Sequence, residues 1–214
     1  MEKSRLPPRR VSPEGLARKA EDFLATHHPA GAIPVPIEEI AEFGLDLNII
    51  PLPNLYKDFG IESWLSADEK SIYVDQFQLE NLEPRYRFTL AHELSHLLLH
   101  QELYRGIQLG SFEDWLQFQE SLDPGQRDDY EWQARNLAGR ILVPDRSLME
   151  ITATCLARVP KDLRGKLGRR ALFGSLSLSI CREFKVSSSV VEIRSVGDGV
   201  GARVLEKEAG QGGS

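Results

Sequence analysis

The stretch RFTLAHELSHLLLH, residues 87–100, places three histidines and a glutamate in an otherwise almost wholly apolar run. Polar side chains in such a run cost free energy unless they have partners. His92 and His96 are four residues apart, so on a helix they lie on one face, about 6 Å apart along the axis, which suits two imidazoles that bind one metal ion. Glu93 lies beside them. The spacing therefore predicts a metal site with a carboxylate next to it.

The pattern H-E-x-x-H is that of zincins, in which two histidines bind zinc and the glutamate takes a proton from water as general base. Iron or manganese would fit the same donors. The alternative from another class is a regulator or interaction module with a structural or vestigial metal site. Glu93 favours the enzyme, because a purely structural zinc needs no base beside an open coordination position.

The third ligand has to come from elsewhere in the chain. On one helix the Cα atom of His100 is about 12 Å from that of His92, so we expect His100 to be a surface residue or a contact of a ligand. The metzincin extension is missing, because LLLHQ follows His96. A carboxylate is the other common solution. The downstream candidates are Glu102, Glu113, Asp114, Glu120, Asp123, Asp128, Asp129 and Glu131.

Glu131 is favoured by its place on a predicted helix. Ala134, Ala138 and Leu142 follow it by three, seven and eleven residues, so its carboxylate points along the buried stripe of that helix. The alternative is a capping box in which Asp128 begins the helix and Glu131 closes it. Asp129 is the next candidate for the ligand.

The elements that position these residues indicate an α+β fold, a zincin-like core with a small antiparallel sheet. Helices are expected over 12–26, with Ser12 as N-cap, 36–43, 85–103, 112–122 and from about 128 to 143, and strands over 45–50, 61–65 and 71–75. The helix over 85–103 is apolar around nearly its whole circumference, which places it in the middle of a domain. We predict that the chain is divided into a metallopeptidase domain over 1–150, a helical helix-turn-helix-like domain over 151–200 and a flexible tail over 201–214.

The segment LSLSICREFKVSSSVVEIRSVG in the C-terminal third has the pattern of a helix-turn-helix. The basic residues just before this segment could contact phosphate, but the second helix carries only Glu192 and Arg194. We therefore favour a module for packing or for docking a repressor over direct DNA binding. The basic residues just before it are Lys161, Arg164, Lys166, Arg169 and Arg170.

The composition of the chain argues against several other classes of protein. The net charge of −6 argues against bulk electrostatic binding of nucleic acid. No apolar stretch approaches the roughly 18 to 20 residues that span a bilayer, and the polar start lacks an apolar signal segment, so we expect a cytoplasmic protein with no membrane contact. The two cysteines, Cys155 and Cys181, are expected to be small core residues.

Two blocks in order, RFTLAHELSHLLLH and EWQARNLAGRILVP, resemble the ImmA/IrrE family of zinc metallopeptidases over about residues 33–144. The resemblance implies one zinc ion per chain on His92, His96 and Glu131, with Glu93 as general base. The chain departs from the family's usual residues at four positions, and these put substrate preference in doubt: Ser95 for glycine, Gln133 for glutamate, Arg135 for asparagine and Leu137 for phenylalanine.

Members of that family cut helix-turn-helix repressors of the XRE type and so switch on stress-response or mobile-element genes. The resemblance therefore implies a repressor as protein substrate. We expect the strand over 71–75 to be an exposed edge that holds an extended peptide by main-chain pairing. Candidates for stabilising the oxyanion are Tyr130, His100 and Arg87, and the long connection over 102–127 is a candidate site for a partner.

Overall fold

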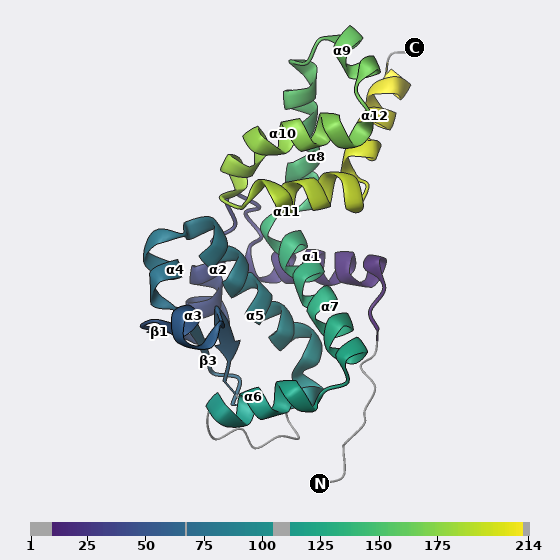
Figure 1. Cartoon of the computed structure of the whole chain (residues 1–214). Helices are drawn as coiled ribbons and strands as arrows, with labels where there is room; N and C mark the ends of the chain where they lie inside the picture. The colour runs from purple at the N-terminus through teal and green to yellow at the C-terminus, as the bar shows by residue number, and fades with distance from the viewer. Residues whose placement is uncertain (1–9, 67, 105–111, 212–214) are drawn as a thin grey trace.

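A computed structural model of the chain describes residues 10–66, 68–104 and 112–211 (Figure 1). The α-helices are α1 (Pro13–His27), α2 (Ile37–Glu39), α3 (Leu55–Phe59), α4 (Gln76–Asn81), α5 (Glu83–Tyr104), α6 (Phe112–Ser121), α7 (Pro124–Leu142), α8 (Asp145–Ala157), α9 (Lys161–Lys166), α10 (Arg169–Phe184), α11 (Ser188–Glu192) and α12 (Val200–Gln211). Single π-helical turns cover Ile40–Gly44 and Ile193–Gly197, and the strands are β1 (Asn48–Leu52), β2 (Ser63–Leu65) and β3 (Ser71–Asp75).

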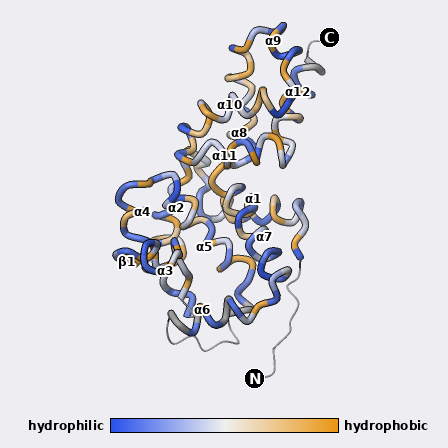
Figure 2. The backbone as a smooth tube through the Cα atoms, viewed as in Figure 1, coloured by the Kyte–Doolittle hydropathy of each residue, from blue (hydrophilic) through white to orange (hydrophobic). Residues whose placement is uncertain are grey.

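Helices α5 and α7 lie side by side in the middle of the molecule, with α1 packed on α7 and the sheet on the other side of α5 (Figure 1). The central place of α5 follows from its apolar circumference. Thr89, Leu90 and Ala91 are all buried, although consecutive residues point about 100° apart around a helix. Apolar residues recur along the helices at both ends of the molecule, and one core cluster joins them (Figure 2).

The sheet is mixed, so the expected antiparallel sheet is wrong in one of its two pairings. β2 and β3 form the predicted antiparallel pair, but β1 runs parallel to β3, with Asn48 opposite Ser71. The strand order β1-β3-β2 puts β3 in the centre. The reason is that α3 separates β1 from β2 and lets the chain return on the far side of β3. The strand over 71–75 is therefore not an edge, and the peptide-binding role expected of it is wrong.

Helix α7 begins four residues earlier than the sequence indicated. Asp123 is its N-cap and accepts hydrogen bonds from the backbone N–H groups of Gly125 and Gln126, while Pro124 occupies the first turn. The helix expected over 112–122 ends just before this Asp-Pro-Gly sequence, which also starts the next helix. Asp128 therefore lies within α7, and the capping box with Glu131 is not present.

Helices α8 to α12 gather at the end of the molecule that carries the C-terminus (Figure 1). Residue 150, the expected domain boundary, lies within α8, and the division into domains stays a prediction. The helix pair α10 and α11 forms as expected, but a helix-turn-helix-like domain is not confirmed. A membrane-crossing helix is absent from the described residues, since no helix there combines the necessary length and apolarity.

The expected flexible tail is wrong for most of its length, because α12 covers Val200–Gln211. Val200 and Val204 are four residues apart and both are buried, and Val204 packs in a small cluster with Leu156 and Leu172. Gly201 lets the helix approach closely, since a Cβ atom there would come within 2.8 Å of the Phe173 ring. Gly201 therefore allows close packing in a segment that was expected to be loose.

Candidate metal centre

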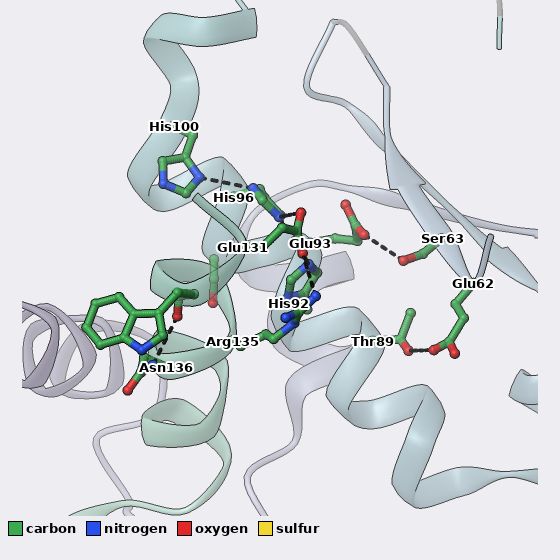
Figure 3. Close-up of polar contacts among 12 residues, drawn as sticks. Glu62, Ser63, Thr89, His92, Glu93, His96, His100, Glu131, Arg135 and Asn136 are labelled. Atoms are coloured by element: carbon green, nitrogen blue, oxygen red, sulfur yellow. Dashed lines mark hydrogen bonds and ion pairs between the residues drawn. The ribbon is translucent and has the colours of Figure 1, made fainter. Parts of the chain in front are cut away.

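Helices α5 and α7 bring together the three side chains predicted to bind a metal. The Nε2 atoms of His92 and His96 are 3.0 Å apart, and the Glu131 carboxylate oxygens lie 3.4 Å from His92 Nε2 and 3.5 Å from His96 Nε2. One donor atom from each of the three lies within 4.8 Å of the others. Figure 3 shows the three side chains pointing toward one another, with Glu93 between them and Ser63.

These separations fit a metal ion. Donor atoms at the usual 2.0–2.2 Å from a tetrahedral zinc are roughly 3.3–3.5 Å from one another. The two Nε2 atoms also need an explanation, because two imidazole lone pairs that face each other at 3.0 Å repel unless a proton or a cation lies between them. Two imidazoles and one carboxylate form the donor set of a catalytic zinc site with a position left for water. The ligand roles stay a prediction, which this geometry supports.

Glu131 reaches the site because the stripe below it on α7 is buried, as predicted: Ala134, Ala138 and Leu142 have no exposed surface. Asp129 points elsewhere and lies 3.9 Å from Arg10. Of the other candidates, Asp123 caps α7, Glu120 and Asp128 are exposed, and Asp114 is outside the cluster. The side chains of Glu102 and Glu113 lie outside the described residues.

The charge of Glu131 is stabilised within the site. Burial raises the pKa of its carboxyl, but the contacts with the His92 and His96 side chains outweigh burial and lower the pKa far below its usual range. A carboxylate ligand is therefore ionised at neutral pH. Arg135, one turn further along α7, donates to Glu131 Oε2 at 3.2 Å from an exposed position.

Glu93 is buried beside the three donors, on the side toward the sheet. Its Oε1 atom accepts a hydrogen bond of 2.6 Å from the Ser63 hydroxyl of β2. Burial raises the pKa of Glu93 despite the lowering effects of His96 and of this hydrogen bond, and the nearby Glu131 adds to the rise. A buried carboxylate with a raised pKa next to a metal site has the properties of a general base.

The three residues considered for the oxyanion lie in different places. His100 is buried, so it is not a surface residue, and its Nδ1 atom is 3.0 Å from Nδ1 of His96. The Tyr130 ring packs edge-on against His100, and burial raises the Tyr130 pKa to about 12. Arg87 donates to the carbonyl of Val35 at 2.6 Å, which directs its guanidinium away from the site.

Three of the four departures from the family's usual residues leave the donors untouched. The Ser95 hydroxyl donates to the carbonyl of Ala91, Gln133 accepts from the backbone N–H of Val11, and Leu137 is part of the core. Only Arg135 contacts a predicted ligand. The i, i+4 spacing of Glu131 and Arg135 could have indicated this contact.

Ser63 is the residue of the site that the sequence did not indicate. It lies 30 positions before Glu93, in a short strand without a motif. The contact exists because β2 packs against α5, and no local pattern reports such packing.

Comparison with known proteins adds one result. Residues 78–195, more than half of the chain, match the model of Peptidase_M78, described as the IrrE N-terminal-like domain. The matched range contains α5 and α7 complete, and so His92, Glu93, His96 and Glu131, but not Ser63. It begins later and ends later than the resemblance seen in the sequence. No curated protein gives a significant match to the chain.

Proposed function

This chain belongs to the Peptidase_M78 family of IrrE N-terminal-like domains, and we propose on that premise that it is a zinc-dependent endopeptidase. Family membership implies a metallopeptidase; zinc, the peptide-bond specificity and the target are our proposal. The observation that carries it is the buried Glu93 carboxylate next to the three converging donor atoms of His92, His96 and Glu131. A site that only stabilised the fold would not need this fourth group.

The residues divide the work of hydrolysis between them. His92, His96 and Glu131 would hold the zinc ion, which when bound polarises a water molecule and the carbonyl of the scissile bond. Glu93 takes a proton from the attacking water and later gives it to the leaving amine. Ser63 holds the Glu93 carboxylate in place through Oε1.

The substrate would pair with the outer side of β2. The N–H of Ser66 and the carbonyl of Glu62 bond toward β3, and backbone groups of an antiparallel strand alternate in direction, so those of Ser63 and Leu65 point away from β3. No strand among the described residues pairs with that side. An extended peptide added there would lie next to Glu93, and main-chain hydrogen bonds would hold it.

The other edge of the sheet is less suited to a peptide. The Asn48 N–H donates to Lys70, toward β3, so Ile49 and Pro51 of β1 face outward. Proline has no N–H to donate, which weakens strand addition at this edge. This difference supports β2 as the docking strand.

We further propose that the target is a helix-turn-helix repressor of the XRE type, cut in the cytoplasm to derepress stress-response or mobile-element genes. This step rests on the family resemblance alone. Direct DNA binding by the chain has less support, because Arg194 of the predicted second helix is buried in an internal ion-pair network.

The test compares the parent protein with Glu93→Gln and with the double substitution His92→Ala and Glu131→Ala, all purified without added metal. Zinc content is measured by mass spectrometry, and each protein is incubated with a helix-turn-helix repressor encoded beside it. We expect about one zinc per chain in the parent and in Glu93→Gln, none in the double variant, and cleavage by the parent only. Loss of the general base should reduce the rate by about 10²–10⁴-fold. A metal-free parent that still binds the repressor or DNA would overturn the proposal in favour of a regulator with a vestigial site.

A further inference from the structure

His100 has no role in the hydrolysis described so far, yet it is only 5% exposed and carries two ring nitrogens. Buried polar groups need partners, and a histidine without one would be replaced at little cost by an apolar residue. The partner in the structure is Nδ1 of His96, at 3.0 Å. The backbone of α5 departs from helical geometry at His100, so the residue lies where the regular helix ends.

We propose that His100 is a positioning residue that fixes the tautomer and the ring orientation of His96, so that Nε2 of His96 presents its lone pair to the metal. The proposal rests on the metal site of the proposed function. It assigns to a neutral imidazole the role that a carboxylate or a backbone carbonyl has beside most metal-binding histidines.

The positions of the protons follow from the geometry. His96 can bind a metal through Nε2 only if its own proton is on Nδ1. That proton then points at Nδ1 of His100, which has to accept it, and His100 carries its proton on Nε2, a buried atom with no hydrogen-bond partner among the described residues. The opposite arrangement would put a proton on Nε2 of His96, which faces Nε2 of His92 at 3.0 Å and would then be blocked as a ligand.

The surroundings of His100 keep it in the accepting form. Its side chain is buried, and burial favours the neutral ring, which can accept a hydrogen bond, over the charged one. Its ring also packs edge-on against Tyr130, with 4.8 Å between the ring centroids. Tyr130 directly precedes Glu131 on α7, so His100 contacts both helices that carry the predicted ligands.

The two predicted histidine ligands differ in this respect. Nδ1 of His92 is buried and has no hydrogen-bond partner among the described residues, whereas Nδ1 of His96 has His100. Orientation by a neighbouring side chain is therefore provided for one ligand only. Substitution of His100 should weaken metal binding through His96 without removing a donor atom.

The experiment uses the full chain, stripped of metal, and measures zinc affinity by competition with a chromophoric chelator at neutral pH. His100→Phe keeps a ring of similar size and loses the acceptor, and His100→Asn keeps an acceptor. The matched control is Ser95→Ala, which removes a buried hydroxyl next to His96 that donates to the Ala91 carbonyl. We expect zinc affinity to fall about 10–100-fold in His100→Phe, to recover at least partly in His100→Asn, and to stay unchanged in Ser95→Ala.

A second measurement does not depend on any variant folding. Long-range ¹H–¹⁵N NMR of the metal-free parent reports which ring nitrogen of His96 carries the proton, and we expect Nδ1. If His100→Phe bound zinc as tightly as the parent does, the role of His100 would be overturned and the proposed function would stand. A proton on Nε2 of His96 in the parent would have the same consequence. A parent that does not bind zinc at all would instead overturn the proposed function, and this inference with it.

Discussion

Helix α7 takes part in two buried charged clusters, and they differ in how their charges are neutralised. The metal-site cluster, His92, His96 and Glu131, lies near the start of the helix. The arginine cluster, Arg140, Arg194 and Arg203 with Asp145 and Asp198, lies at its end, about 14 Å further along the axis from Glu131 to Arg140. Both place ionisable groups in the interior, where an unpaired charge is costly.

In the arginine cluster the chain supplies its own cations. Asp145 bonds to Arg194 and Arg203, and Asp198 bonds to Arg194 and to Arg140, the last at 3.1 Å, so each carboxylate oxygen has an arginine partner. In the metal-site cluster the donor atoms face one another, and the neighbouring cation Arg135 is 63% exposed at the periphery. We infer that a cluster satisfied by its own residues has a structural role, whereas a cluster that needs a cation from outside has a functional one.

Removing the predicted ligands should have the largest effect on function and a small effect on the fold. His92→Ala and Glu131→Ala each take away a donor atom, so we expect zinc binding and cleavage to be lost. For His92→Ala the free energy of unfolding of the metal-free protein should stay within about 1 kcal/mol or rise, because a buried polar group is removed together with its desolvation cost. Metal content and thermal unfolding, measured on the same samples, check both parts. A variant that lost its fold together with its metal would contradict the distinction between the clusters.

The reverse result is expected at the other end of α7. Arg194→Met removes the guanidinium shared by Asp145 and Asp198 and leaves both carboxylates short of a partner. Removing one partner of a buried ion pair typically lowers the free energy of unfolding by about 3–5 kcal/mol. We expect a loss of that order in urea unfolding, with zinc content per folded chain unchanged. The control Arg146→Met breaks an exposed pair with Glu150 and should cost at most about 0.5 kcal/mol.

The two clusters should also respond to different ranges of pH. The folded pKa of His100 lies at about 3, below the usual histidine value of 6.5. As the pH falls from about 6.5 to 3, only the unfolded chain therefore takes up a proton at this residue. The folded state loses stability over that range. In the metal-free protein this contributes a slope of up to about 1.4 kcal/mol per pH unit. Asp145 titrates with the same sign but at lower pH: burial raises its pKa, but Arg203 and Arg194 outweigh burial and lower the pKa below the usual aspartate value. Its stabilising effect is complete above about pH 4 and is lost only below that value.

Unfolding free energies between pH 7 and 4.5 test this difference. His100→Asn should flatten the dependence seen in the metal-free parent, and Asp145→Asn should lower stability by the same amount throughout that range. An unchanged slope in His100→Asn would mean that His100 is not held neutral in the folded protein.

Comparison of the clusters explains which parts of the molecule the sequence could predict. Local spacing is a property of the helix, so the i, i+4 pair His92 and His96 and the buried stripe below Glu131 were predicted and lie as expected. Start and stop signals were less reliable: the Asp123-Pro124 pair both ends one segment and begins α7. The i, i+4 pair Val200 and Val204 was hidden among glycines.

Contacts between distant elements were not predictable in the same way. Arg194 was noted only as one of two charges on the predicted second helix, and its burial depends on Asp145, 49 residues away. The central place of β3 depends on the path of the chain through α3. A single sequence contains no signal for such pairings, because they result from which surfaces remain to be covered once the local elements have formed.

The substitution with the smallest expected effect on activity is that of Ser63. Its hydroxyl is the side-chain donor that the structure gives to Glu93, so it partly satisfies the metal-site cluster from the sheet side. Ser63→Ala removes a hydrogen bond that lowers the Glu93 pKa, so the pKa should rise further and a smaller fraction of the base is ionised at neutral pH. We expect kcat to fall by roughly tenfold, the acidic limb of the pH–rate profile to move to higher pH, and zinc content to stay at one per chain. Ser63→Thr keeps the hydroxyl and should retain most of the activity. If Ser63→Ala instead raised KM with kcat unchanged, the hydroxyl would contribute to peptide docking at β2 and not to the function of the base.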